Sequence, residues 1–262
     1  MSGRGIKLFN LLGFEVRLHP SWLILAVLIV WSLATGFFPL ELPGYSRAAY
    51  IWMGIAGAFG LLFSIVIHEF AHSAVAWHYG IPMRGIVLFI FGGVAEMADE
   101  PPTAKTEFLM AIAGPLTSFL VALCSFGVAI GLRSAGQAEI GAIFGYLAAT
   151  NLLLGLFNLI PAFPLDGGRV LRAAIWSRKG DIVPSTRIAS RIGSGFGVLL
   201  MLLGVVSVLR GNVVSGLWSF LIGMFVRGAS KMSYEQVLRR RSLEVARLRA
   251  LLEDQPEPSV RS

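Results

Sequence analysis

The sequence predicts a mainly α-helical, polytopic membrane protein of about six transmembrane helices. Hydrophobic residues make up 55% of its 262 residues and charged residues only 14%, whereas a soluble domain usually carries about 25% charged residues. Long apolar runs recur along the chain, each bounded by polar or turn-forming residues. Sparse charge combined with such runs is typical of a chain that crosses a bilayer several times.

Six segments are long or apolar enough to cross a hydrocarbon core of about 30 Å at about 1.5 Å per residue. The first follows a basic stretch, but it is too long for a signal-peptide core and no small-residue cleavage site follows it, so we interpret it as a retained span. The predicted spans are approximately Pro20–Phe38, Tyr50–Tyr79, Phe108–Leu132, Gly141–Ile160, Gly193–Leu209 and Val213–Val226.

The distribution of positive charge predicts the orientation of these spans. With the N-terminus in the cytoplasm, 19 of the 22 Lys and Arg residues fall on the cytoplasmic side, and only Arg47, Arg133 and Arg210 fall outside. Cytoplasmic loops carry such an excess, so both termini are expected in the cytoplasm. The net charge of +7 therefore needs only the lipid bilayer as a partner and no nucleic acid.

Three regions follow from this pattern. Residues 1–19 are predicted to be a cytoplasmic arm, residues 20–228 a single intramembrane domain, and residues 229–262 a cytoplasmic tail. Within the tail, apolar residues at helical spacing between arginines (residues 233–252) predict an amphipathic helix lying on the membrane surface. An ordinary solvated or oligomer-packing helix is the alternative, and a disordered end is expected from Asp254.

The second predicted span contains a metal-binding pattern, His68-Glu69-Phe-Ala-His72. Residues four apart share one face of a helix, so both imidazoles can reach one ion, and Glu69 lies beside them to take a proton from water. Zinc bound in this way supplies a nucleophile near neutral pH. Ionisable residues inside a membrane are costly and usually functional. The alternative is a structural polar cluster between helices.

Catalytic zinc usually has a third protein ligand. His78 points to a different face of the helix than His72, and His19 is expected to cap the first span or contact headgroups. The better candidate is Asp166, which follows two prolines and precedes Gly167-Gly168 after the fourth span. Irregular backbone at this depth is tolerated only where protein or an aqueous cavity covers it. A turn-forming aspartate before two glycines is the alternative.

These residues resemble the site-2 protease family of intramembrane zinc metalloproteases. Both motifs, His68-Glu-Phe-Ala-His72 and the stretch from Asn158 to Gly168, occur in the family's order and in the corresponding spans. The resemblance implies that Asp166 is the third zinc ligand and that Asn158 is a polar helper near the substrate or transition state. It also implies a short membrane-associated β element in the segment from Arg84 to Met97, and the β-branched and aromatic content with a Gly-Gly turn agrees.

Two departures qualify the resemblance. The segment Ala113-Gly114-Pro115-Leu-Thr-Ser118 is similar to a family stretch that usually ends in asparagine, so the hydrogen bonding around the third span is expected to differ. The second departure is that we identify no PDZ-sized insertion and no paired CBS domains after the core. The arrangement is therefore closest to a small prokaryotic form without PDZ or CBS domains, and the resemblance implies a prokaryotic inner membrane.

The sequence therefore predicts an intramembrane zinc endopeptidase that holds one Zn²⁺ per chain. It would cleave transmembrane segments of membrane-anchored proteins near the cytoplasmic side, in regulated intramembrane proteolysis, with Glu69 as general base and then general acid. One alternative is a membrane zinc transporter, although transporters place several sites along a path and often show repeated halves. The other is a non-catalytic membrane scaffold, which would have no need of Glu69.

Overall fold

The computed structural model of the chain describes residues 5–11, 14–89, 92–97 and 100–253. The chain divides into two compact units, Met1–Ile160 and Pro161–Ser262. Six helical segments in the described part are long and apolar enough to cross a membrane, which confirms the predicted number. They are Ser21–Glu41, Arg47–His78, Ala104–Ser134, Ala138–Asn158, Ile182–Leu209 and Val213–Leu251.

The first unit is built around α3 (Arg47–His78), which contacts the helices on both sides of it in the chain. Its neighbours are α1 (Ser21–Ser32), the π-helical turn η1 (Leu33–Phe37), α2 (Phe38–Glu41), α4 (Ala104–Ser134) and α5 (Ala138–Asn158). The long helices α3 and α4 begin at hydroxyl caps, because Ser46 and Thr103 accept hydrogen bonds from backbone N–H groups three residues on.

Close helix packing in the first unit depends on small and polar residues. A Cβ at Gly60 of α3 would lie 2.7 Å from the side chain of Leu147 on α5, so the glycine allows this approach with Leu147 in its present position. Deeper in the same interface, the buried Asn151 amide donates to Ser64 Oγ at 2.9 Å and to Leu147 O at 2.8 Å. These contacts hold α5 against the face of α3 that also carries the two histidines.

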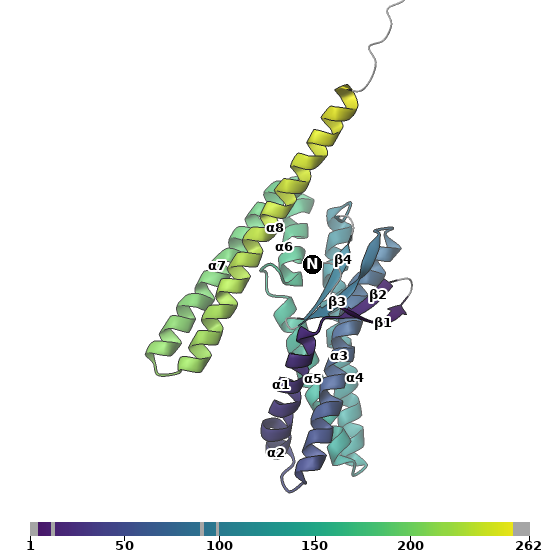
Figure 1. Ribbon diagram of the computed structural model, residues 1–262, viewed down its shortest axis with the longest axis vertical. Coiled ribbons are helices and arrows are strands. Elements are labelled where there is room, and N and C mark those ends of the chain that lie inside the picture. Colours follow the sequence, from purple (N-terminus) through teal and green to yellow (C-terminus); the bar gives the residue numbers. More distant parts are fainter. Residues whose placement is uncertain (1–4, 12–13, 90–91, 98–99, 254–262) are drawn as a thin grey trace, which may run out of the picture. The chain divides into compact units, whose positions relative to one another are not determined.

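A four-stranded sheet belongs to the first unit and has the order β1-β2-β3-β4. Its strands are β1 (Ile6–Leu11), β2 (Phe14–Leu18), β3 (Met83–Phe89) and β4 (Gly92–Met97). The two outer pairs are antiparallel and β2 pairs with β3 in parallel. In the chain, β2 is followed by α1 and α3 is followed by β3, so the sheet lies at the end of the unit where α1 begins and α3 ends (Figure 1).

The β element after α3 is thus confirmed, but its details differ from the prediction. Gly92 and Gly93 lie within β4, paired with Phe89 and Leu88, and do not form the turn themselves. The arm at residues 1–19 was predicted without any strand, yet it supplies β1 and β2. Sequence periodicity missed them because this arm is paired with a strand about 70 residues away, a long-range contact that local pattern does not reveal.

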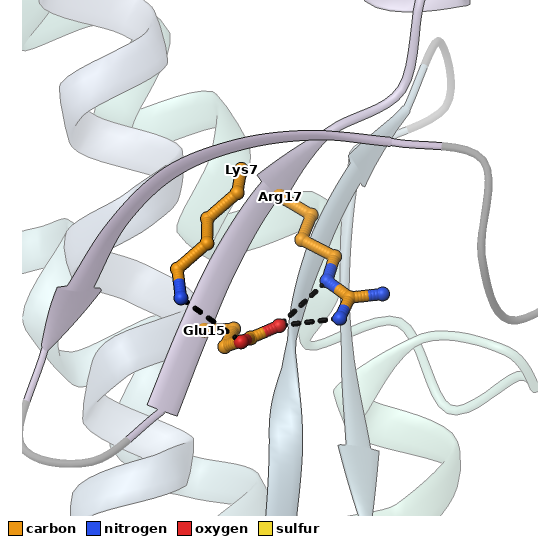
Figure 2. Close-up of polar contacts among 3 residues, drawn as sticks. All are labelled: Lys7, Glu15 and Arg17. Carbon is orange, nitrogen blue, oxygen red and sulfur yellow. Dashed lines mark hydrogen bonds and ion pairs between the residues drawn. The ribbon is translucent and has the colours of Figure 1, made fainter.

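Three charged side chains form ion pairs on β1 and β2 (Figure 2). Lys7 of β1 pairs with Glu15 across the two strands, whereas Arg17 pairs with Glu15 within β2. Glu15 accepts hydrogen bonds from Lys7 Nζ at 3.0 Å and from Arg17 Nε at 2.9 Å. The hydrogen bonds from Arg17 and then from Lys7 lower the pKa of the Glu15 carboxyl below its usual range. The carboxylate form of Glu15 therefore stabilises this hairpin.

The second unit consists of one short and two long helices. They are α6 (Asp166–Lys179), α7 (Ile182–Leu209) and α8 (Val213–Glu253). In α6, Gly168 packs so closely on the preceding segment that a Cβ there would lie 2.7 Å from the backbone of Ala162 and Phe163. Asp166 was predicted in irregular backbone, whereas the structure places it in the first turn of α6, after the irregular Pro161–Leu165.

The helices α7 and α8 form a tight hairpin, with backbones in contact at glycines. Gly197 faces Gly223 and Gly204 faces Gly216, and a Cβ at any of these positions would lie about 2.5 to 2.6 Å from the opposing carbonyl oxygen. The helix predicted for residues 233–252 is the continuation of α8, with no break after the span. It follows the last span directly, and its place along the membrane surface stays a prediction.

Candidate metal centre

Two histidines of α3 converge within the first unit. The Nε2 atoms of His68 and His72 lie 3.2 Å apart, with ring centroids at 4.9 Å and interplanar angle 82°. Their exposed fractions are only 3% and 5%. The four-residue spacing brings them to one face of the helix, as the sequence predicted.

The helix α4 holds the other nitrogen of each ring. His72 Nδ1 lies 2.7 Å from the backbone oxygen of Met110, and His68 Nδ1 lies 2.8 Å from Ser118 Oγ. A carbonyl oxygen can only accept, so Nδ1 of His72 carries the proton and its Nε2 presents a lone pair. Outer partners of this kind orient metal-binding imidazoles in known metal sites.

Gly114 leaves open the space in front of the two Nε2 atoms. A Cβ built at this position would lie 2.3 Å from Nε2 of His72 and 2.6 Å from Nε2 of His68. No side chain can occupy this point without displacing the imidazoles. These distances approach those of a bound metal ion, since zinc lies about 2.0 to 2.1 Å from a histidine nitrogen.

The spacing of the two nitrogens fits zinc. Two ligand atoms about 2.05 Å from a tetrahedral centre are separated by about 3.3 Å, and the Nε2 atoms are 3.2 Å apart. Two neutral imidazole nitrogens are also ligands that zinc favours. The first unit therefore supplies two ligands in suitable geometry, with space beside them for an ion.

The other predicted site residues lie on three helices. Glu69 is partly buried on α3 beside His68. Asn158 ends α5, where its amide donates to Leu154 O at 3.1 Å. Asp166 belongs to the second unit, where it is 9% exposed and opens α6, followed by the buried Gly167.

The other two histidines, His19 and His78, were not predicted to bind the metal and lie elsewhere. His19 Nδ1 lies 2.8 Å from Ser21 Oγ and accepts from the backbone N–H of Ser21 at the start of α1. His78 is exposed at the end of α3 and stacks edge-on against Tyr79.

Sequence reasoning did not identify Gly114 and Ser118 as parts of the site. Both stand in the segment Ala113–Ser118 that the resemblance had singled out, but nothing in the sequence indicated what they contact. A glycine and a serine four residues apart in a membrane helix are also typical of ordinary helix packing. Only the pairing of α3 with α4 reveals that they face the imidazoles.

Taken together, the six apolar helices and the paired imidazoles define an integral membrane protein with a candidate metal centre on its second span. Comparison with known proteins agrees. The sequence profile of Peptidase family M50 matches residues 56–134 and 132–203. The chain belongs to this family.

Individual relatives support the same assignment. The putative zinc metalloprotease Rip3 of Mycobacterium tuberculosis is 40% identical over 229 residues, which is 86% of this chain and 58% of that protein. A putative zinc metalloprotease of Synechocystis is 38% identical over 223 residues, 84% of this chain and 57% of the relative. The chain thus spans somewhat more than half the length of these two curated relatives.

A solved structure shares the fold. The site-2 protease from Methanocaldococcus jannaschii superposes with a TM-score of 0.56 at 31% identity, covering 88% of this chain and 95% of that one. The predicted fold class and the resemblance to the site-2 protease family are confirmed.

Proposed function

We propose that this protein is an intramembrane zinc endopeptidase that cleaves membrane-anchored proteins within or near their transmembrane segments. The observation that carries the proposal is the convergence of the two Nε2 atoms, 3.2 Å apart, on a point kept open by Gly114. Family membership and the zinc metalloprotease names of the relatives support it.

In this proposal His68, His72 and Asp166 hold one zinc ion per chain. Two imidazole nitrogens and one carboxylate oxygen form a common ligand set for catalytic zinc and leave a position for water or substrate. Zinc there would polarise the scissile carbonyl and lower the pKa of water toward 7. Asp166 is the buried first residue of α6.

Glu69 moves the proton in this mechanism. Its carboxylate takes a proton from the attacking water as the new C–O bond forms, and passes it to the amide nitrogen as the C–N bond breaks. The fixed Nδ1–H of His72 keeps Nε2 of that ring available to the metal throughout. Asn158 is proposed as a polar helper near the substrate, because it ends a helix that packs on α3.

The edge of the sheet offers a way to hold an extended substrate. Strand β4 pairs with β3 on one side, and among the described strands it has no partner on the other. A substrate segment could add there by main-chain hydrogen bonds. A helix shields its peptide bonds from water, so a substrate segment must be extended before those bonds can be hydrolysed.

Orientation and biological context extend the proposal. The distribution of lysine and arginine supports cytoplasmic termini and therefore cleavage near the cytoplasmic side. The bacterial relatives support a prokaryotic inner membrane as the location. Such cleavage releases cytoplasmic domains, the step on which regulated intramembrane proteolysis depends.

The experiment pairs zinc content with cleavage of a reporter transmembrane protein. We expect Glu69→Gln to keep zinc and lose cleavage, and His72→Ala and Asp166→Ala to lose both. His78→Ala is the matched control, because His78 lies on the same helix but away from the paired imidazoles, and it should behave as wild type. Zinc binding without cleavage by any variant, or export of zinc from loaded vesicles, would favour the scaffold or the transporter instead.

A further inference from the structure

The two imidazoles have outer partners of different chemical character. The Met110 carbonyl beside His72 Nδ1 can only accept a hydrogen bond, so that tautomer is fixed. The Ser118 hydroxyl beside His68 Nδ1 can either accept or donate. The tautomer of His68 is therefore set by which role Ser118 takes.

Only one of these roles prepares His68 for a metal. If Ser118 accepts from Nδ1–H, Nε2 of His68 carries no proton and presents its lone pair at the point in front of Gly114. If Ser118 donates, the proton sits on Nε2, which lies 3.2 Å from Nε2 of His72. The second arrangement closes the pair with an imidazole–imidazole hydrogen bond.

Burial makes this choice depend on Ser118. The exposed fractions are 1% for Ser118 and 3% for His68, so bulk water cannot replace the hydroxyl. Without it, Nδ1 of His68 loses the partner on α4 that the structure gives it, which favours the closed arrangement.

We propose that Ser118 is a positioning residue of the metal centre, whose hydroxyl accepts from His68 Nδ1–H and so keeps Nε2 of that ring available to zinc. The inference rests on the proposed zinc site and adds the residue that prepares it. The asparagine usual at this position in the resembling family carries an amide oxygen, which could accept the same hydrogen bond.

The test measures zinc affinity by competition with a chromophoric chelator, together with the visible spectrum of the cobalt-substituted protein. Ser118→Ala should lower zinc affinity roughly 10- to 100-fold and distort the tetrahedral cobalt spectrum. Ser118→Asn should keep most of the affinity. Ser125→Ala is the matched control, since Ser125 is buried two turns further along α4, and it should leave affinity unchanged.

A second measurement keeps the test independent of metal affinity. Histidine labelled with ¹⁵N reports four imidazoles in this chain, and in the zinc-loaded protein the Nδ1–H of His68 should be protected from exchange in wild type and Ser125→Ala but not in Ser118→Ala. Equal affinity and equal protection in Ser118→Ala and wild type would overturn the inference alone. Failure of wild type to bind zinc would overturn the proposed function, and the role of Ser118 with it.

Discussion

Replacing Gly114 with alanine places a methyl group where the metal is proposed to lie. The added Cβ would lie 2.3 Å and 2.6 Å from the two Nε2 atoms, about 1 Å inside an ordinary carbon–nitrogen contact. Neither ring can retreat freely, because α4 holds the Nδ1 atoms at 2.7 Å and 2.8 Å. We therefore expect Gly114→Ala to abolish stoichiometric zinc binding and, with it, cleavage.

The same substitution should not impair the helix itself. Alanine is favoured over glycine in a helix interior by about 1 kcal/mol, so loss of zinc would not reflect a weakened α4. Gly127→Ala is the matched control, because a Cβ at Gly127, on the same helix, meets nothing within 4 Å. It should bind zinc as wild type does.

The assay is metal content by mass spectrometry after gel filtration, with cleavage of the reporter measured on the same samples. Zinc bound by Gly114→Ala at the wild-type ratio would refute the reasoning, since it would place the ion elsewhere. Equal loss of zinc in Gly127→Ala would also refute it, by showing that the effect is general to α4.

Two further predictions concern the frame of the site. Gly197→Val should loosen the hairpin of α7 and α8 and lower the free energy of unfolding by about 1 to 3 kcal/mol, because a Cβ at this position would lie 2.6 Å from Gly223 O. Gly195→Val is the control and should cost less, because a Cβ at Gly195 meets nothing within 4 Å. Equal thermal unfolding midpoints for the two variants would contradict the close packing. Since the folded pKa of Glu15 is lowered, its stabilisation of β1 and β2 is present above the ordinary carboxyl pKa and is lost as pH falls through the folded value. The protection of backbone amides in these strands, measured as exchange relative to the intrinsic rate at each pH, should therefore fall on acidification in wild type more than in Glu15→Gln. Equal responses of the two proteins would show that the ion pairs contribute nothing.

The membrane class and the paired histidines were predictable because both depend on local sequence. Six spans follow from apolar content, and the contact of His68 with His72 follows from a four-residue spacing on one helix. The boundaries were less predictable. The helix α7 begins at Ile182, eleven residues before the predicted Gly193, because its first turns carry polar residues such as Ser185 and Arg187 and so fall below the hydropathy of a span.

Features that depend on distant pairing were not predictable from one sequence. Ser118 lies 50 residues from His68, and nothing in its own neighbourhood indicates that it faces an imidazole. The pairing of β2 with β3 joins residues such as Val16 and Ile86 across two membrane spans. From local pattern alone, residues 1–19 were predicted to be a basic arm, because the lysine and arginine residues of this segment are as prominent in the sequence as its apolar residues.

The central claim is that Glu69 performs proton transfer at a zinc site that cuts transmembrane segments. The most direct measurement is mass spectrometry of a reporter transmembrane protein incubated in liposomes with zinc-loaded wild type or zinc-loaded Glu69→Gln. The account predicts a product cut within or beside the membrane segment, formed by wild type, abolished by Glu69→Gln at equal zinc content, and restored by zinc after chelation of the wild type. The same product from Glu69→Gln at the wild-type rate would contradict it.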